Sequence, residues 1–456
     1  MTPDHPPASA AELLSHPRFV EAMSLAGTPL IRDITDKYRP WPKVRAIARD
    51  KGLDPLLAWI ATKWQRRAMW RPLPLRSEAG QPFMLAQTGS ISEQLHRLDR
   101  ETGGGGSVAL DREHGVFSDE ETQRRFLIRS MMDEAIDSAI MEGSRTSIRA
   151  ARELLRSGRP PRDKHEQMVA NNYEAMRRIK GWIERPLSIE MLVEIQSILT
   201  TGALDDDAPR DGSGRLRRPG EVVDVVDKRS HDVVYTPPMA EQMPQRLQSV
   251  CDFANASHVA GTFLHPIIKA CVLHFMIGYE HPFVDGNGRT ARAVFYWCAL
   301  RHGYRIVEFL SISELIRAAS ASYPHAYMNV ESDDNDITYF VLYKLDIIRR
   351  ALERLAGYLA EEEKRILDSR RLLRLDSKLN LRQRLLLEFA IKNPTAEFSA
   401  QSQATVYGVT QMTARADLEH LRRRRFLRSF KVGKKVVYVL EPDIVRRLAS
   451  SIRKHG

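Results

Sequence analysis

The sequence predicts a mainly α-helical protein that carries two β-hairpins. Apolar residues recur at helical spacing through most of the chain. Two short β-branched runs, Val222–Val226 and Val233–Tyr235, interrupt that pattern and predict one hairpin. From about Ser377 the chain is expected to form three helices followed by two strands that turn at Gly433–Lys434.

The length of 456 residues favours two or three domains. A content of 43% hydrophobic and 28% charged residues is typical of a soluble protein with an ample core. The glycine-rich stretch Thr102–Ser107 indicates a linker or loop. We therefore expect a helical N-terminal region over residues 1–110, a helical core over 111–365 and a C-terminal domain over 376–456.

The cysteines and the N-terminus favour a cytoplasmic protein. Cys251, Cys271 and Cys298 form no spaced framework, so reduced thiols are expected rather than disulfides or a metal site. The first residues lack a basic segment followed by an apolar one, so no signal peptide is expected. No window approaches about 18 consecutive apolar residues, so we expect no membrane partner.

The positive charge is concentrated near the C-terminus. The whole chain carries a formal charge of +11, and counting from Arg370 to the end gives 20 basic and 7 acidic residues. The rest of the chain is then close to neutral. This local excess predicts an anionic partner for the C-terminal end, with nucleic acid as the first candidate.

The segment His281–Arg292, HPFVDGNGRTAR, is a charged, glycine-broken loop between two apolar helices. Pro282 cannot continue the first helix, so the chain turns there. Gly286 and Gly288 around Asn287 permit positive φ and close approach of the backbone to a ligand. The second helix is expected to begin at about Gly288, which directs its N-terminus at whatever the loop binds.

Arg289 and Arg292 are expected to share one face of the first turn of that second helix. Cations at a helix N-terminus oppose the helix dipole by about 0.3–1 kcal/mol each, so an anion, most often phosphate, is expected to bind there. Asp285 beside an anion site favours a divalent cation, Mg²⁺ by its ligand type. His281 can accept a proton near neutral pH, and this set of groups is typical of phosphoryl or nucleotidyl transfer. The alternative is a loop whose arginines pair only with nearby carboxylates.

The segment matches the signature of the Fic family, H-P-F-x-[DE]-G-N-G-R-x-x-R, at every fixed position. The resemblance extends over about Phe117–Leu359, and residues 38–68 loosely resemble a segment that precedes the core in larger Fic proteins. It implies a Fic-fold helical core and transfer of AMP from ATP to a Ser, Thr or Tyr hydroxyl of a target protein. The cofactors implied are ATP and Mg²⁺.

The resemblance also assigns roles to residues. His281 would be the general base and Asp285 the Mg²⁺ ligand, and Tyr323 resembles one of two tyrosines near the adenine pocket, the second being Pro324 here. The residues expected to hold the phosphates of ATP are Gly286, Asn287, Gly288, Arg289, Thr290, Ala291 and Arg292. A relative that phosphorylates its target has lysine where this chain has Gly288. Relatives that transfer phosphocholine have alanine where this chain has Gly286. Neither change is present here, so AMP transfer is favoured.

The first hairpin resembles the flap with which Fic enzymes hold a target segment. Val223, Asp224 and Val225 would pair with the target as a strand is added, which needs no particular target sequence. The target could be another protein or a second copy of the chain, and a homodimer is an open alternative.

Ser138–Gly143, SAIMEG, resembles the inhibitory pattern [ST]-x-x-x-E-[GN] of autoinhibited Fic proteins, with Ser138, Glu142 and Gly143 at its fixed positions. Glu142 would pair with Arg292 and occupy the place of the γ-phosphate. The resting enzyme is then expected to be largely inactive. A surface glutamate before a helix-ending glycine is the alternative.

The C-terminal block resembles a winged helix-turn-helix domain. Its third helix would be the recognition helix, with Lys431, Lys434 and Lys435 on the wing and Arg422–Arg425 available for phosphate contacts. Protein contacts or dimerisation are the alternative use of this block. Two other functions stay open: a DNA-binding regulator whose Fic domain senses nucleotide, and an enzyme that removes AMP from a target.

Overall fold

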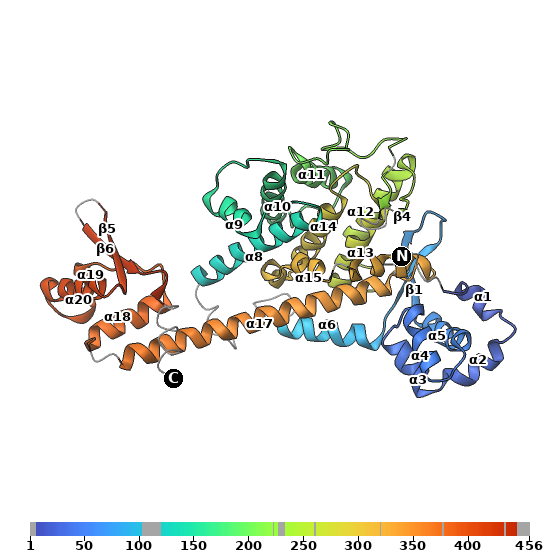
Figure 1. Ribbon diagram of the computed structural model, residues 1–456, viewed down its shortest axis with the longest axis horizontal. Helices are drawn as coiled ribbons and strands as arrows, with labels where there is room; N and C mark the ends of the chain where they lie inside the picture. Colours follow the sequence, from blue (N-terminus) through green and yellow to red (C-terminus); the bar gives the residue numbers. More distant parts are fainter. Residues whose placement is uncertain are drawn as a thin grey trace. The chain divides into compact units, whose positions relative to one another are not determined.

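The computed structural model is mainly helical, with three two-stranded hairpins among the residues that it describes (Figure 1). The described residues are 6–102, 120–221, 223–226, 233–259, 261–319, 321–375, 378–432 and 435–444. Several sequence predictions lie outside them: the linker after Thr102, residue Val222 and the Gly433–Lys434 turn with Lys434.

The chain divides into two compact units. Unit 1 comprises Met1–Val108 and Arg129–Leu352, and unit 2 comprises Ala109–Ile128 and Glu353–Gly456. The three-domain division expected from the sequence stays a prediction. Among the described residues no helix combines the length and the apolar character needed to cross a membrane.

The N-terminal part of unit 1 is a group of short helices packed around one longer helix. These helices are α1 (Ala10–Leu14), α2 (Phe19–Ala26), α3 (Pro29–Asp36), α4 (Trp41–Asp50) and α5 (Pro55–Met69). Pro29 and Pro55 stand in the first turns of their helices, where the missing N–H costs nothing, and Thr28 and Asp54 cap the preceding positions. The buried rings of Trp41 and Trp59 meet edge to face in the core of this group.

A hairpin that the sequence did not indicate follows these helices. Strand β1 (Trp70–Arg76) pairs antiparallel with β2 (Pro82–Ala86), and helix α6 (Gly89–Thr102) comes next. Pro72 and Pro74 argue against a strand because proline cannot donate to a ladder, and they occupy exposed positions of β1. The other strand is tied to the start of α17, where Ile337 donates its N–H to the Met84 carbonyl at 2.9 Å.

The helical core of unit 1 is built around two adjacent buried helices. Figure 1 shows α13 (Pro266–Glu280) and α14 (Asn287–Arg301) surrounded by the other helices of the core. Their residues are buried on almost every side, as expected for helices that are apolar all round. The other helices of this region are α9 (Ile148–Ser157), α10 (Lys164–Gly181), α11 (Ile189–Thr200), α12 (Met243–Asn255), α15 (Ile312–Ala318) and α16 (Ser322–Ser332), with the parts of α8 (Glu120–Met141) from Arg129 on and of α17 (Thr338–Leu375) up to Leu352.

The hairpin predicted before α12 is confirmed. Strand β3 (Val225–Val226) pairs antiparallel with β4 (Val233–Tyr235), with Val225 opposite Tyr235. The Tyr235 hydroxyl donates to the carbonyl of Tyr279 near the end of α13 at 2.8 Å, which anchors β4 beside the loop that follows α13.

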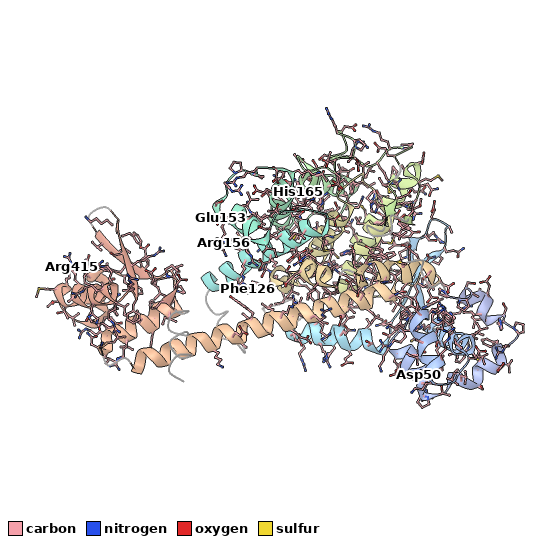
Figure 2. The ribbon with its side chains drawn as sticks, viewed as in Figure 1. Asp50, Phe126, Glu153, Arg156, His165 and Arg415 are labelled. Carbon is pink, nitrogen blue, oxygen red and sulfur yellow. The ribbon has the colours of Figure 1, made fainter. Side chains whose placement is uncertain are left out.

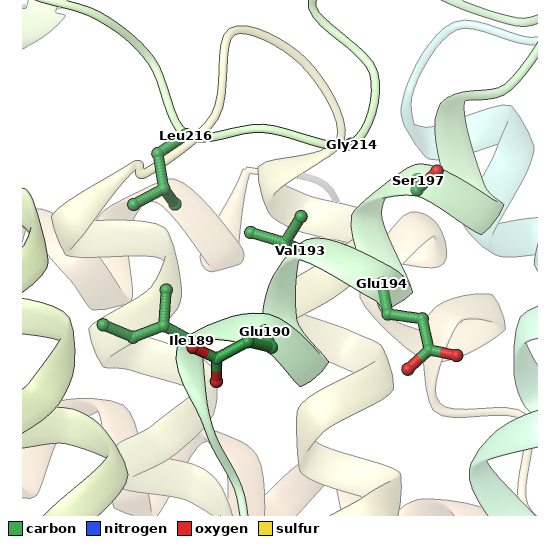
Figure 3. Close-up of a pocket in the computed structure, with 7 residues that line it drawn as sticks. All are labelled: Ile189, Glu190, Val193, Glu194, Ser197, Gly214 and Leu216. Carbon is green, nitrogen blue, oxygen red and sulfur yellow. The ribbon is translucent and has the colours of Figure 1, made fainter.

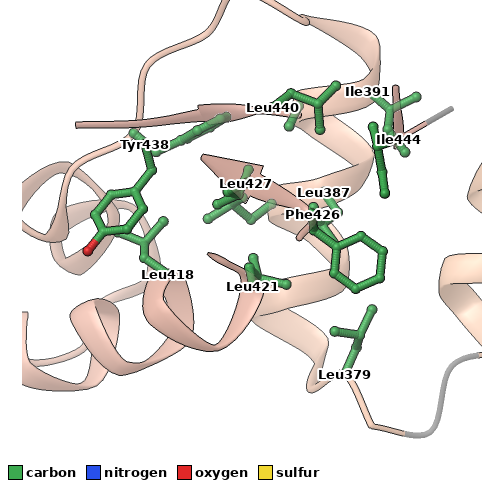
Figure 4. Packing of buried hydrophobic residues seen from close by; sticks show 13 residues of the cluster. Leu379, Leu387, Ile391, Leu418, Leu421, Phe426, Leu427, Tyr438, Leu440 and Ile444 are labelled. Carbon is green, nitrogen blue, oxygen red and sulfur yellow. The ribbon is translucent and has the colours of Figure 1, made fainter. Parts of the chain in front are cut away.

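The C-terminal part of unit 2 has the predicted order of three helices and a hairpin. These elements are α18 (Leu381–Lys392), α19 (Ala400–Tyr407), α20 (Gln411–Arg423), β5 (Leu427–Val432) and β6 (Lys435–Leu440). They enclose a core of their own, in which Leu387, Leu418 and Leu421 are fully buried (Figure 4). Phe398 exchanges two backbone hydrogen bonds of 2.8 Å with Tyr438, which fixes the hairpin against the connection between α18 and α19.

The three cysteines are free and buried among the described residues. Burial raises the pKa of each of the thiols of Cys251, Cys271 and Cys298 to about 12. They are therefore protonated at neutral pH and unreactive.

A buried polar network joins the N-terminal helices to the start of α17. Lys63 on α5 is fully buried and contacts Asp333 at 2.7 Å and Asp334 at 2.9 Å. Arg66, one turn later, donates to the Tyr339 hydroxyl at 2.6 Å, and that hydroxyl donates to Asp333 at 2.7 Å. Lys63 pairs with the two aspartates, and the buried Arg66 guanidinium donates to the Tyr339 hydroxyl and the Arg39 carbonyl, so the network holds the two regions together.

Lys63→Met is expected to destabilise the protein by about 3–5 kcal/mol, because it leaves the buried Asp333 carboxylate without its cation. Urea unfolding measures this change. Lys37→Met is the matched control, since the Lys37–Asp33 pair is half-exposed on both sides and is expected to contribute less than about 1 kcal/mol. Equal losses for the two variants would contradict this account of the network.

Candidate active site

The loop between α13 and α14 carries the histidine of the motif in a left-handed backbone conformation. His281 caps α13 with φ 48°, a value that non-glycine residues rarely adopt and that is most often retained at functional sites. Its Nδ1 lies 3.1 Å from the Gly278 carbonyl oxygen. Because a carbonyl only accepts, Nδ1 is the protonated nitrogen, and Nε2 is left as the proton acceptor.

Burial lowers the pKa of His281 below its usual value, although the Gly278 carbonyl and the charge of Glu142 act in the opposite direction. The ring is therefore neutral at physiological pH. A neutral imidazole with a fixed tautomer has the properties required of a general base.

The side chain of Asn287 holds the loop closed. Its Oδ1 accepts the Phe283 N–H at 3.0 Å, and its Nδ2 donates to the Phe283 carbonyl at 2.8 Å. Phe283 itself is fully buried, so the asparagine links the first turn of α14 to a residue anchored in the core. Both polar atoms of the Asn287 side chain are therefore used within the loop.

Asp285 is buried and forms a short ion pair within the loop. Its Oδ1 accepts the Gly286 N–H at 2.5 Å and lies 2.7 Å from Nη2 of Arg289. The other oxygen, Oδ2, accepts the Asp205 N–H at 3.3 Å. Burial raises the pKa of Asp205, and the nearby charge of Asp285 adds to the effect.

The second donor of Arg289 binds the end of α11. Nη1 contacts the Leu199 carbonyl at 3.0 Å, so the guanidinium joins α11, α14 and Asp285. Thr290 and Ala291 follow in the first turn of α14 and are fully buried, and the Thr290 hydroxyl has no hydrogen-bond partner.

Arg292 reaches the last turns of α8. Its Nε donates to the Ser138 hydroxyl at 2.9 Å, and its Nη2 donates to the Ser138 carbonyl at 3.2 Å and to Glu142 Oε1 at 2.8 Å. The guanidinium is only 3% exposed, and Nη1 has no partner. Ser138 lies in the last turn of α8, and Glu142 follows one turn later, just after the helix ends. Both therefore contact the same guanidinium.

The space above Gly288 is filled by the Glu142 carboxylate. A Cβ at position 288 would lie 2.4 Å from Glu142 Oε1 and 3.3 Å from Arg292 Nη1. Gly288 stands in the first turn of α14, where backbone N–H groups have no partner within the helix. The carboxylate therefore occupies the position that a helix N-terminus and an arginine prepare for an anion. Gly143, with φ 107°, turns the chain away directly afterwards.

Two further acids, which no local sequence pattern marks, hold the same stretch of α8. Glu134 accepts the N–H and the hydroxyl of Ser313 at 2.9 and 2.6 Å, and Asp137 pairs with Arg317 at 2.7 Å. Burial raises the pKa of Asp137 to about 6. The face of α8 that presents Ser138 is thus fixed against α15 by two independent contacts.

Gln196 and Arg217 position the motif loop from outside it. The fully buried Gln196 donates to the Asp285 carbonyl at 3.1 Å and accepts the Gly214 N–H at 2.7 Å. Arg217 donates its backbone N–H to the Pro282 carbonyl and its Nε to the His281 carbonyl, both at 2.9 Å. The same guanidinium donates to the Pro238 carbonyl after β4, so it joins the histidine to the base of the hairpin.

Tyr323 lies in an aromatic cluster behind the motif. Its hydroxyl is 2.9 Å from Nε2 of the buried His274, and its ring packs edge to face against Tyr327. The hairpin residues Val223 and Asp224 precede β3, and Asp224 accepts a hydrogen bond of 2.8 Å from Thr236. The structure thus brings Glu142, Arg292 and Gly288 into contact, and Asp285 with Arg289. The hairpin is tied to the end of α13 through Tyr235, and Tyr323 lies near enough to Arg292 and Glu142 for their charges to act on its hydroxyl.

One pocket in this region lies away from the motif. A pocket of about 460 Å³ lies between α11 and the segment that follows it (Figure 3), and none of the residues that line it belongs to His281–Arg292. A second cavity, of about 10 Å³, lies beneath Arg289 and Arg292 and is lined in part by Asn172, whose Oδ1 has no partner. Its size and polarity suit a single water molecule.

Residues 186–299, which include the whole loop, match the Fic/DOC family. The protein adenylyltransferase Fic of Nematostella vectensis is 30% identical over 126 residues, 28% of this chain and 26% of that protein. The protein of the same name from Drosophila erecta is 27% identical over 119 residues, 26% of this chain and 22% of that protein. The chain thus spans about a quarter of the length of the curated relatives that it matches.

Solved structures share the fold. A Fic family protein from Desulfovibrio desulfuricans G20 superposes with a TM-score of 0.51 at 18% identity, over 78% of this chain and 97% of that chain. A fragment of Fic-1 from C. elegans gives a TM-score of 0.51 at 16% identity, over 78% and 90%. These superpositions identify the fold as mainly helical with small hairpins. Over residues 186–299 the chain is similar to the Fic/DOC family, and the distant relatives given above are named protein adenylyltransferases.

The pKa of His281 is expected to lie below 6.5, with the proton of the neutral ring on Nδ1. Histidine ring NMR measures both quantities, and His281→Gln assigns the signal. Glu142→Gln is expected to lower the pKa further, because it removes a negative charge that favours the protonated ring. A pKa above 6.5, or an Nε2–H tautomer, would contradict the assignment of His281 as a base.

Proposed function

We propose that the protein is an adenylyltransferase that moves AMP from ATP to a Ser, Thr or Tyr hydroxyl of a target protein, and that Glu142 holds it inactive. One observation carries the proposal: the Glu142 carboxylate contacts Arg292 over Gly288, in the first turn of α14. A helix N-terminus with an arginine beside it is a site for phosphate. The Fic/DOC match and the names of the relatives supply the reaction class.

The reaction needs a base, and His281 is the candidate. Nε2 would take the proton of the target hydroxyl as the hydroxyl oxygen bonds to the α-phosphorus of ATP. The bond from that phosphorus to the bridging oxygen breaks, and pyrophosphate leaves with the electron pair. The Gly278 carbonyl keeps the proton of the neutral ring on Nδ1, so Nε2 is free to act.

The phosphates would lie along the first turn of α14. The backbone N–H groups of Asn287 and Gly288 and the guanidinium of Arg292 are the expected donors. Gly288 leaves room for a phosphate oxygen because any Cβ would enter the space that Glu142 now fills. The partnerless Nη1 of Arg292 faces the same space, at 3.3 Å from that Cβ position.

Asp285 fits a bound Mg²⁺ by the chemistry of its donor. Mg²⁺ in phosphate sites is held by one or two carboxylates together with phosphate and water oxygens. Within the part of the chain that the structure describes, no group of three or more His, Cys, Asp or Glu could hold a metal alone. A bound Mg²⁺ would neutralise charge on the phosphates, and Asp285 would then share its carboxylate between the ion and Arg289.

Glu142 would inhibit by competition for Arg292. A γ-phosphate and this carboxylate both need the same guanidinium, so both cannot bind in the same place. The Arg292–Glu142 contact is a charge-assisted hydrogen bond of 2.8 Å, and the Arg292 guanidinium is buried. The contacts of Glu134 and Asp137 with α15 would keep α8 in the inhibitory position.

The β3–β4 hairpin is the proposed flap for the target segment. It is anchored next to the catalytic histidine through Tyr235 and Arg217, so a strand added to it would pass close to His281. Val223, Asp224 and Val225 are the positions expected to pair with that strand.

We also propose that residues 376–456 form a winged helix-turn-helix domain. The order of α18, α19, α20 and the β5–β6 hairpin supports this fold, as does the separate core that they enclose.

Glu142→Gly is expected to raise self-modification with labelled ATP and Mg²⁺ by at least about tenfold, because it frees Arg292 from a charge-assisted hydrogen bond. Mass spectrometry of the protein and of a lysate would locate the added AMP. His281→Ala in the same background is expected to abolish the reaction. Glu194→Gln is the control, since this glutamate is half-exposed on α11 and pairs with the half-exposed Arg185.

An unchanged signal for Glu142→Gly would exclude inhibition by Glu142. Release of AMP from a modified protein, dependent on Glu142, would instead support removal of AMP as the reaction. Modification that persists in His281→Ala would exclude His281 as the base.

A further inference from the structure

One glycine of α13 lies directly beneath a tyrosine of α16. Gly278 is inside the helix and does not adopt a positive φ, so the backbone alone does not require a glycine there. Alanine is ordinarily the more stable residue inside a helix. A Cβ at Gly278, however, would lie 2.3 Å from Oη of Tyr327 and 2.9 Å from its Cζ. The tyrosine therefore explains why a glycine stands at this position.

The ring of Tyr327 is held in that place by three other aromatic rings. It stacks on Phe275 with the ring centroids 4.9 Å apart, and it meets Phe340 and Tyr323 edge to face at 4.8 and 5.3 Å. Phe275 and Phe340 are fully buried, and Figure 2 shows how densely side chains fill the space around α13. The ring cannot leave Gly278 without breaking these contacts, because protein interiors are close-packed.

Two hydroxyl groups of α16 contact the turn of α13 that precedes Gly278. The Tyr327 hydroxyl donates to the His274 carbonyl at 3.4 Å, and the Tyr323 hydroxyl lies 2.9 Å from Nε2 of the same histidine. His274 stands about one helical turn before Gly278. The last turn of α13 is thus fixed from one side by α16.

The carbonyl of Gly278 is the group through which this packing reaches His281. In a continuing helix this carbonyl would accept the N–H of residue 282, but Pro282 has none. It accepts the Nδ1–H of His281 instead, at 3.1 Å. The position of the carbonyl therefore decides which ring nitrogen of His281 carries the proton.

We propose that Tyr327 is a positioning residue for His281, because it packs on Gly278 and so fixes the carbonyl that holds the imidazole proton on Nδ1. The inference rests on the function proposed above, in which Nε2 of His281 is the base. Neither Tyr327 nor Gly278 belongs to the segment His281–Arg292, and both act on the reaction through the histidine.

A role in packing alone is the alternative. Substitutions at Gly278 or Tyr327 would then change the stability of the aromatic cluster and leave the tautomer of His281 as it is. The tautomer ratio separates the two roles, because packing alone does not move it.

The test is histidine ring NMR on the full chain, with the His281 signal assigned by His281→Gln. Gly278→Ala and Tyr327→Leu are each expected to lower the ratio of the Nδ1–H to the Nε2–H form by at least about fivefold, because the hydrogen bond that sets the ratio is lost. Tyr327→Phe keeps the ring and is expected to stay near the wild-type ratio. Combining Gly278→Ala with Tyr327→Phe removes the closest contact of the new Cβ, so part of the ratio is expected to return.

AMP transfer supplies a second readout. In the Glu142→Gly background, Gly278→Ala and Tyr327→Leu are expected to lower kcat by about tenfold or more and to leave KM for ATP nearly unchanged, because the base loses its orientation and the phosphate site does not. Gly357→Ala is the matched control and is expected to change neither readout. Gly357 also lies inside a helix, α17, and a Cβ there would meet nothing within 4 Å.

The inference is overturned if the folded Gly278→Ala and Tyr327→Leu proteins keep the wild-type tautomer ratio, or if Gly357→Ala or Tyr327→Phe changes it as much. It is also overturned if circular dichroism shows that neither Gly278→Ala nor Tyr327→Leu folds, since the pair then serves the fold. Absence of AMP transfer in the Glu142→Gly parent would instead contradict the proposed function, because the tautomer is measured without any reaction.

Discussion

The ion pair between Arg292 and Glu142 is the interaction on which the rest of the site depends. A guanidinium that is 3% exposed needs an anion and hydrogen-bond acceptors, since a buried unpaired charge is very costly. Ser138 and Glu142 supply both. The end of α8 must therefore lie against the first turn of α14 whenever no other anion is present, and it occupies the place where we propose that the γ-phosphate binds.

The same constraint explains why the supporting contacts are spread over several elements. Glu134 and Asp137 fix α8 to α15, Gln196 fixes the Asp285 backbone, and Arg217 joins the His281 carbonyl to the segment after β4. None of these side chains needs to touch the substrate. Together they hold His281, Asp285 and Arg292 at fixed positions relative to one another. A reaction that depends on the orientation of its groups requires such fixed positions.

The sequence predicted those parts of the fold and site that depend on short-range patterns. The loop between two apolar helices, the β3–β4 hairpin and the order of α18 to β6 follow from proline, glycine and side-chain periodicity, and all were confirmed. The β1–β2 hairpin was missed because Pro72 and Pro74 argue against a strand. The hairpin is stabilised by backbone hydrogen bonds between β2 and the start of α17, which is distant in the sequence. Gln196 and Arg217 bind the backbone of the motif loop, 89 and 64 residues further along the chain, and no local pattern marks such a residue.

The most direct test of the central claim is a crystal structure of the Glu142→Gly protein with ATP and Mg²⁺. We expect a γ-phosphate oxygen within hydrogen-bond distance of Arg292, in the space above Gly288, with the α-phosphorus facing Nε2 of His281. A nucleotide bound elsewhere, with that space left to solvent and Arg292 still bound only to Ser138, would contradict the claim that Glu142 holds the place of a phosphate.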